Sequence, residues 1–248
     1  MDIPYLRITG WGGAIRSKYM SNKNYTPELE SKLMYAENEY YRCIHEMDCK
    51  FGDPEFTEEA KWFENEIKKV IRIGTKHITL LRYVDVEWTV VGLHRGAQDD
   101  FDAHAERYDN RIVRMSTRTI KDGKLAEISD WYKDKILTFQ DIVELCNLPE
   151  EVVKGGVTFT RTPFGYMRKD LIGSSIEGDV RRGLIPLAVS STFIVKCQIT
   201  ELCHVFRERN SSGHAAPELK LMIEDVVKKI SNQYPDLNRD FFLNSCLQ

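Results

Sequence analysis

The sequence predicts an α+β fold in which several helices pack against a small sheet. Apolar residues recur at helical spacing in three segments, residues 26–44, 57–73 and 217–230. Residues 84–90 instead alternate between apolar and polar side chains, the pattern of a half-buried strand. Because no repeat, low-complexity tract or clear linker divides the chain, we expect a single domain covering residues 1–248.

The composition is that of an ordinary globular protein. Of its 248 residues, 42% are hydrophobic and 29% are charged, which allows a substantial core. The net charge of −3 lacks the basic excess of a general nucleic-acid binder. The apolar runs are too short to cross a bilayer, and the first residues do not form a signal peptide, so we expect a cytoplasmic protein.

The six cysteines show no metal-binding or redox pattern. None forms a Cys-x-x-Cys pair, and no Cys/His spacing resembles a zinc site. We therefore expect reduced, mostly buried thiols and no metal centre. A catalytic cysteine stays open, although no local sequence favours one.

The first half of the chain predicts two helices, a strand and a polar helix. The glycines in residues 10–19 (GWGGAIRSKY) predict a loop, and this loop lacks the spacing of a phosphate-binding motif. Thr26 and Pro27 start the first helix, and the second helix ends near Gly74. The strand begins near Tyr83 and closes at Gly92, and residues 94–110 predict a polar helix.

The second half predicts further short elements. Thr138 is expected to begin a helix with Asp141 as its capping partner, and Pro149 to end it. The inward-facing residues of this helix are predicted to be Ile142, Val143 and Leu145. Residues 157–160 predict a strand, residues 162–165 a turn, and Pro217 the start of the last helix.

Residues 111–118 (RIVRMSTR) are a candidate phosphate cradle. Guanidinium groups bind oxyanions in a bidentate manner, and the hydroxyls of Ser116 and Thr117 offer further hydrogen bonds. On these residues alone, a solvated basic segment without a ligand is the favoured interpretation. His77, in residues 77–79, is a second candidate for a ligand contact. On these residues alone, a structural role is the favoured interpretation, because an isolated histidine is more often structural.

Residues 182–218 carry a more specific pattern. Arg182-Gly-Leu-Ile-Pro186 is followed by Gln198, by Arg209 at the end of a predicted helix, and by His214-Ala-x-x-Glu218. The order and spacing resemble the C-terminal signature of the flavin-dependent thymidylate synthase (ThyX) family, which reads Arg-x-x-Leu-Pro, Asn-Ala-Arg, Leu-Arg and His-Ala-Gln-Trp-Glu. The resemblance implies a central antiparallel or mixed sheet flanked by helices, in a homotetramer.

Two earlier segments fit the same resemblance. His77-Ile78-Thr79 stands where the family has Gly-His-x-Ser/Thr-Pro, and Ser116-Thr117-Arg118 stands at its closing Ser-x-Arg, with Arg111 matching the preceding Arg-His-Arg. The family's Asn-Glu pair is missing, and Gln198-Ile199-Thr200 replaces Asn-Ala-Arg. Residues 119–175 depart from the family pattern.

The resemblance implies an activity and a role for each matching residue. The family converts dUMP to dTMP by reductive methylation, using methylenetetrahydrofolate and NADPH through FAD. Arg209 would be the catalytic residue, since a fixed positive charge favours the ionised pyrimidine ring. The implied nucleotide-binding residues are Ser116, Arg118, Arg182 and Arg209. The implied flavin-binding residues are His77, Thr79, Arg111, Gln198, His204 and His214.

Two alternatives stay open. One is a related flavin enzyme that acts on another pyrimidine nucleotide. The other is a non-catalytic nucleotide-binding homologue that keeps the fold and the tetramer. The missing Asn-Glu pair and the lost arginine of Asn-Ala-Arg favour the second alternative.

Overall fold

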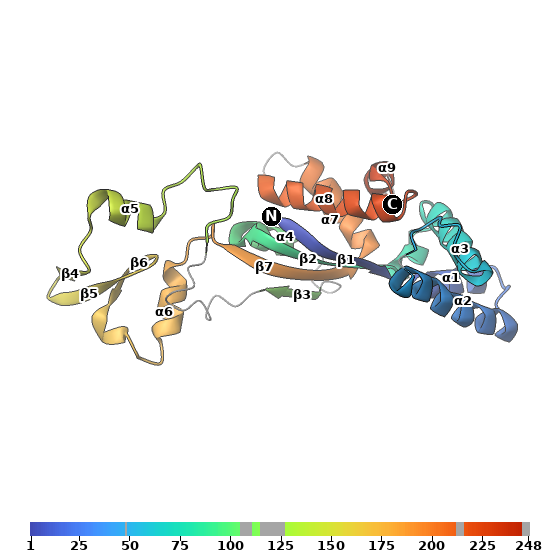
Figure 1. The fold of residues 1–248 in the computed structure, drawn as a ribbon, viewed down its shortest axis with the longest axis horizontal. Helices are drawn as coiled ribbons and strands as arrows, with labels where there is room; N and C mark the ends of the chain where they lie inside the picture. The colour runs from blue at the N-terminus through green and yellow to red at the C-terminus, as the bar shows by residue number, and fades with distance from the viewer. Residues whose placement is uncertain (48, 105–110, 115–126, 212–215, 245–248) are drawn as a thin grey trace.

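The computed structural model describes residues 1–47, 49–104, 111–114, 127–211 and 216–244. Its centre is a four-stranded antiparallel sheet in the order β1-β2-β7-β3 (Figure 1). The strands are β1 (Asp2–Thr9), β2 (Asp85–His94), β3 (Arg111–Arg114) and β7 (Ser190–Gln198). The expected α+β class with an antiparallel sheet is confirmed.

Helices cover one face of this sheet. In Figure 1, α7 (Ile199–Ser211), α8 (Pro217–Gln233) and α9 (Arg239–Asn244) lie above the strands. The predicted inward face of the last helix is confirmed, and its buried residues include Leu219, Met222, Ile223, Val226 and Ile230. The other face carries partly exposed apolar side chains. These are Tyr5, Val91, Val113 and Ile194.

Three N-terminal helices lie at one end of the sheet (Figure 1). They are α1 (Trp11–Ser21), α2 (Pro27–Glu46) and α3 (Glu58–Gly74). The predicted starts of α2 and α3 are confirmed, because the hydroxyls of Thr26 and Thr57 accept hydrogen bonds from the N–H groups of Leu29 and Ala60, each at 3.2 Å. Thr75, after Gly74, is the C-cap of α3.

The predicted loop at residues 10–19 is wrong, because Trp11–Ser21 is a helix. Its residues Trp11, Ala14, Ile15 and Lys18 share one buried face. Gly10 has φ 87°, and a Cβ there would lie 1.8 Å from the carbonyl oxygen of Tyr83. The glycine therefore allows a close approach of two backbones rather than a flexible loop.

The predicted strand is confirmed, but it extends past Gly92 to His94. Gly92 has φ 92° and sits at an irregularity in the pairing between β2 and β7, so it bends the strand without ending it. A 3-10 helix, η1 (Ile78–Tyr83), precedes β2, and α4 (Arg95–His104) follows it. The polar helix predicted at 94–110 is thus confirmed over Arg95–His104, and residues 105–110 lie outside the described residues.

A lobe built from residues 127–188 lies at the opposite end of the sheet from α1–α3 (Figure 1). It contains α5 (Phe139–Cys146), β4 (Glu151–Lys154), β5 (Val157–Thr162), β6 (Gly165–Arg168), η3 (Lys169–Leu171) and α6 (Glu177–Leu184). β4, β5 and β6 form a second antiparallel sheet. The strand predicted at 157–160 and the turn after it are confirmed.

The helix predicted after Thr138 forms, with its capping box intact. Its predicted inward face is partly wrong, because Ile142 is exposed and Leu145 is 73% exposed, whereas Val143 is buried. The helix ends at Cys146, where Asn147 takes a left-handed conformation (φ 49°), rather than at Pro149. In the part of the chain that the structure describes, no helix has the length and apolarity of a membrane span.

Candidate functional site

One end of the central sheet gathers most of the residues expected to line a flavin. The N–H of Ile199 donates to the carbonyl oxygen of Val84 at 2.8 Å, and Gln198 pairs with Asp85 in the sheet register. Through these bonds, η1 packs against the end of β7 and the start of α7. His77 directly precedes η1, and Thr79 lies within it.

The side chains at this end can be reached from solvent. His77 and Thr79 are exposed, and Gln198 and His204 are half-buried. The amide oxygen of Gln198 accepts from the hydroxyl of Thr200 at 3.3 Å. Imidazole, hydroxyl and amide groups therefore come from η1, β7 and α7, three elements in mutual contact.

Arg111 begins β3 near the same end of the sheet. Its backbone pairs with Lys196, two residues before Gln198. The Nζ atom of Lys196 lies 3.4 Å from a carboxylate oxygen of Asp85. The register thus brings Arg111 and Gln198 to neighbouring strands, and the side chain of Arg111 lies outside the described part of the structure.

Arg209 is a buried cation near the C-terminal end of α7. It is 4% exposed, and its Nη1 atom lies 3.0 and 3.2 Å from the two carboxylate oxygens of Asp100 on α4. Asp100 also accepts a hydrogen bond from the N–H of Ala216 at 3.2 Å. Among the described residues, the Nε atom of Arg209 has no hydrogen-bond partner. Burying a guanidinium group destabilises the folded state unless the group is paired, and Asp100 provides this pairing for Arg209.

Arg114, which belongs to the candidate phosphate cradle at residues 111–118, is a second cation held by carboxylates. Its Nη1 atom lies 2.6 Å from Asp99, and its Nη2 atom lies 2.7 Å from Asp102. The guanidinium group also faces the ring of Phe193, with its carbon 6.0 Å from the ring centroid. The signal that points to this arrangement is the acidic cluster in residues 99–102 of the polar helix, which precedes a basic strand.

Arg182 lies elsewhere. It is exposed on α6 in the lobe, while its neighbour Arg181 pairs with Glu177 at 2.7 Å. Arg209 lies on α7 beside the central sheet, so the two arginines belong to different parts of the described structure (Figure 1). Three further predicted site residues, Ser116, Arg118 and His214, lie outside the described residues.

Glu218, the last residue of the His-Ala-x-x-Glu segment, joins three parts of the chain. Its carboxylate accepts hydrogen bonds from the hydroxyl of Ser129 and the backbone N–H of His94, and it closely contacts Nδ1 of the His94 ring. The hydroxyl of Tyr132 lies 3.4 Å from the other ring nitrogen of His94. This buried network ties α8 and β2 to the segment that leads into the lobe.

The pKa of Glu218 reflects the same contacts. Burial by itself raises the pKa of the carboxyl group, because the charged form loses its hydration. The hydrogen bonds from His94 and Ser129 favour the charged form and hold the pKa below its ordinary value. Glu218 is therefore an ionised structural partner of His94 at neutral pH.

Comparison with known proteins identifies the fold. No protein-family profile and no curated protein sequence matches the chain. The chain is similar to a crystal structure of flavin-dependent thymidylate synthase ThyX from Helicobacter pylori with FAD and dUMP, with a TM-score of 0.52, 12% identity, and coverage of 97% of this chain and 99% of the other. A second structure of that enzyme with FAD and dUMP gives a TM-score of 0.50, 12% identity and coverage of 98% and 100%. The chain therefore has the fold of flavin-dependent thymidylate synthase over almost its whole length.

Proposed function

We propose that this protein is a flavin-dependent thymidylate synthase, which converts dUMP to dTMP with methylenetetrahydrofolate as the one-carbon donor and NADPH as the reductant. The observation that carries the proposal is Arg209, a buried cation held by Asp100 within a thymidylate synthase fold. A cation held in this way can stabilise the negative charge that must develop on the pyrimidine ring for methylation at C5.

Arg209 would supply the fixed charge for that step. Its guanidinium group is held in position before the substrate binds, so little reorganisation is required as charge develops on the pyrimidine. Asp100 fixes the orientation of the group through Nη1, and among the described residues the buried Nε atom has no hydrogen-bond partner. Arg182, Ser116 and Arg118 would hold the rest of the nucleotide.

The residues at the η1 end of the sheet suit a flavin. His77, Thr79, Gln198 and His204 offer solvent-accessible donors and acceptors for a polar ring edge, and Arg111 and His214 would complete the set. Bound FAD would supply the hydride chemistry that amino-acid side chains lack. The protein would bind and orient the ring.

A homotetramer would complete such sites. The strand register aligns Tyr5, Thr89, Ile194 and Val113 across the sheet face that no described helix covers. Strand alternation places Gln198 on this same face as Ile194. Tyr5, Ile194 and Val113 form an apolar row on this face, next to a charged row that includes Glu87 and Lys196. Burial of the apolar row against another subunit would bring a second chain over the sheet face that carries Gln198.

One specific observation favours the non-catalytic alternative. Arg114 and Arg209 both have carboxylate partners on α4, and a protein that binds nucleotides without catalysis would also tolerate arginines held in this way. A related flavin enzyme that acts on another pyrimidine nucleotide would keep the η1 end and change its nucleotide preference.

The test is to titrate the purified protein with FAD and then follow NADPH oxidation with dUMP or UMP. The proposal predicts a flavin absorption spectrum on the protein and NADPH oxidation stimulated by dUMP. Stimulation by UMP alone would favour the related enzyme. A protein that takes up no FAD but binds dUMP would be the non-catalytic homologue.

A further inference from the structure

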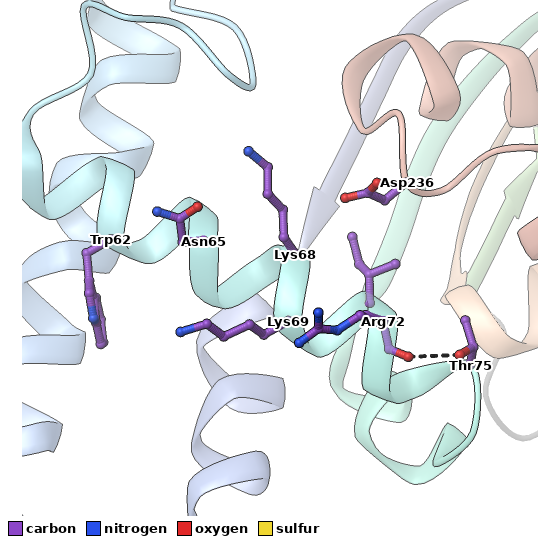
Figure 2. Close-up of a pocket in the computed structure, with 8 residues that line it drawn as sticks. Trp62, Asn65, Lys68, Lys69, Arg72, Thr75 and Asp236 are labelled. Carbon is purple, nitrogen blue, oxygen red and sulfur yellow. Dashed lines mark hydrogen bonds between the residues drawn. The ribbon is translucent and has the colours of Figure 1, made fainter.

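A basic groove runs along α3, and none of the residues that line it is assigned above to the flavin or the nucleotide. It encloses about 690 Å³ and is lined by Trp62, Asn65, Lys68, Lys69, Ile71, Arg72, Thr75 and Asp236 (Figure 2). Positions 62, 65, 69 and 72 follow helical spacing, so they form one stripe on the helix surface. At a rise of 1.5 Å per residue, the stripe from Trp62 to Thr75 is about 20 Å long.

Two buried carboxylates form ion pairs with the lysines of this groove. Lys69 pairs with Glu66 at 2.7 Å, and Glu66, which is 1% exposed, also closely contacts Lys18 on α1. One carboxylate therefore serves two ammonium groups. Lys68 closely contacts Glu64, whose second oxygen accepts from the N–H of Gly52 at 2.8 Å. Each of these two carboxylates therefore has a second partner besides the lysine of the groove.

The cationic groups remain accessible to a ligand. The side chains of Lys68 and Lys69 are 41% and 51% exposed, whereas their partner carboxylates are buried. Each ammonium group has three N–H donors, so it can bind an anion on the solvent side while it keeps its carboxylate partner. Among the described residues, Arg72 makes no ion pair, and Asp236 is the one acid that lines the groove.

We propose that the α3 groove binds a ligand that carries a row of anionic groups, either linked phosphates or linked carboxylates. Arg72 would bind one oxyanion through two parallel N–H donors, and Lys68 and Lys69 would bind its neighbours. Asn65 adds a neutral donor, and Trp62, whose ring centroid lies 4.3 Å from Nζ of Lys32, stands at one end of the stripe (Figure 2). The groove lies outside the proposed flavin and nucleotide residues, so this site is independent of the proposed function.

The experiment uses the full chain and two probes, inorganic tripolyphosphate and a tri-glutamate peptide. Binding is measured by calorimetry at low and physiological salt, and by the fluorescence of Trp62. We expect at least one probe to bind, and Arg72→Gln and Lys69→Gln each to weaken binding about tenfold, the loss of one charge-assisted contact. Trp62→Phe should remove the fluorescence change and keep the binding.

Lys61→Gln is the matched control, because Lys61 lies on the same helix, pairs with Glu58 and does not line the groove. Its affinity should equal that of the unmodified chain. Binding of tripolyphosphate alone would assign phosphates, and binding of tri-glutamate alone would assign carboxylates. The proposal is overturned if neither probe binds at low salt, or if Lys61→Gln weakens binding as much as Arg72→Gln does.

Discussion

Asp100 presents both of its carboxylate oxygens to Nη1 of Arg209, at 3.0 and 3.2 Å. This contact joins α4 to α7 across 109 residues of sequence. The same carboxylate holds the N–H of Ala216, so the first turn of α8 is tied to the same point. The position of the proposed catalytic arginine therefore depends on an aspartate from another part of the chain.

Replacing Asp100 tests this dependence. Asp100→Asn leaves the Arg209 guanidinium buried without an anionic partner, and we expect the free energy of unfolding to fall by about 1–3 kcal/mol. Urea denaturation measures the change. Asp134→Asn is the control, because Asp134 pairs with Lys135 at the surface, with 77% of its side chain exposed, and should change stability by less than about 0.5 kcal/mol. Equal losses in the two variants would show that Asp100 has no special role.

The buried Glu218 network predicts a specific pH dependence. Since the pKa of Glu218 in the folded protein lies below its ordinary value of 4.5, the ionised carboxylate stabilises the fold at neutral pH. That contribution is lost as the pH falls below 4.5 and passes the lower folded pKa.

Glu218→Gln should therefore lower the unfolding free energy by about 1–3 kcal/mol at pH 7, and the gap to the unmodified protein should narrow as the pH approaches 3. Denaturation curves at several pH values measure this gap. A gap that stays constant from pH 7 to pH 3 would mean that the charge on Glu218 contributes nothing.

The cysteines predict a simple labelling pattern. Cys43, Cys49, Cys197 and Cys203 are buried, and Cys146 is exposed. Burial raises the pKa of the Cys197 thiol well above its ordinary value, and nearby Glu201 and Asp85 add to the effect, so the thiolate is suppressed. A thiol reagent at pH 8, followed by peptide mass mapping, should label Cys146 and leave Cys197 unmodified in the folded protein. Rapid labelling of Cys197 would contradict the buried position of β7.

The proposed flavin site at the η1 end of the sheet predicts an effect of replacing His77. His77→Ala should weaken FAD binding about tenfold, because the proposed site then loses one hydrogen-bonding group. His45→Ala is a suitable control, since His45 is also exposed but lies at the end of α2, stacked on Tyr41. The measurement is the dissociation constant of FAD from flavin fluorescence. Equal affinities for all three proteins would remove His77 from the site.

The sequence predicts best the elements that are specified locally. The helices after Thr26 and Thr57 carry their caps and apolar faces within one segment, and both form as predicted. The glycines around Trp11 predict a loop, but the segment is a helix, because the close approach of Tyr83 to Gly10 comes from a distant part of the chain. The apolar pattern predicts Ile142 and Leu145 to face inward, but both are exposed, since such a pattern does not show whether a partner surface exists.

The same limit applies to the candidate site. The motifs at residues 77–79, 111–118 and 182–218 resemble those of flavin-dependent thymidylate synthases, and this resemblance predicts the fold. The pairing of Arg209 with Asp100, and of Arg114 with Asp99 and Asp102, depends on how α4 packs beside α7 and β3. Such contacts between distant segments leave no periodic signal in the sequence.

The central claim is that Arg209 activates a pyrimidine nucleotide for methylation at C5. Because methylation replaces the hydrogen at C5, the most direct measurement is the release of tritium from C5-labelled dUMP with FAD, NADPH and methylenetetrahydrofolate present. The proposal predicts release by the unmodified protein and a loss of at least about a hundredfold in Arg209→Gln, as is typical when a group that stabilises developing charge is removed. If FAD and dUMP both bind but the protein releases no tritium, or if Arg209→Gln releases it at the same rate, the proposal is contradicted.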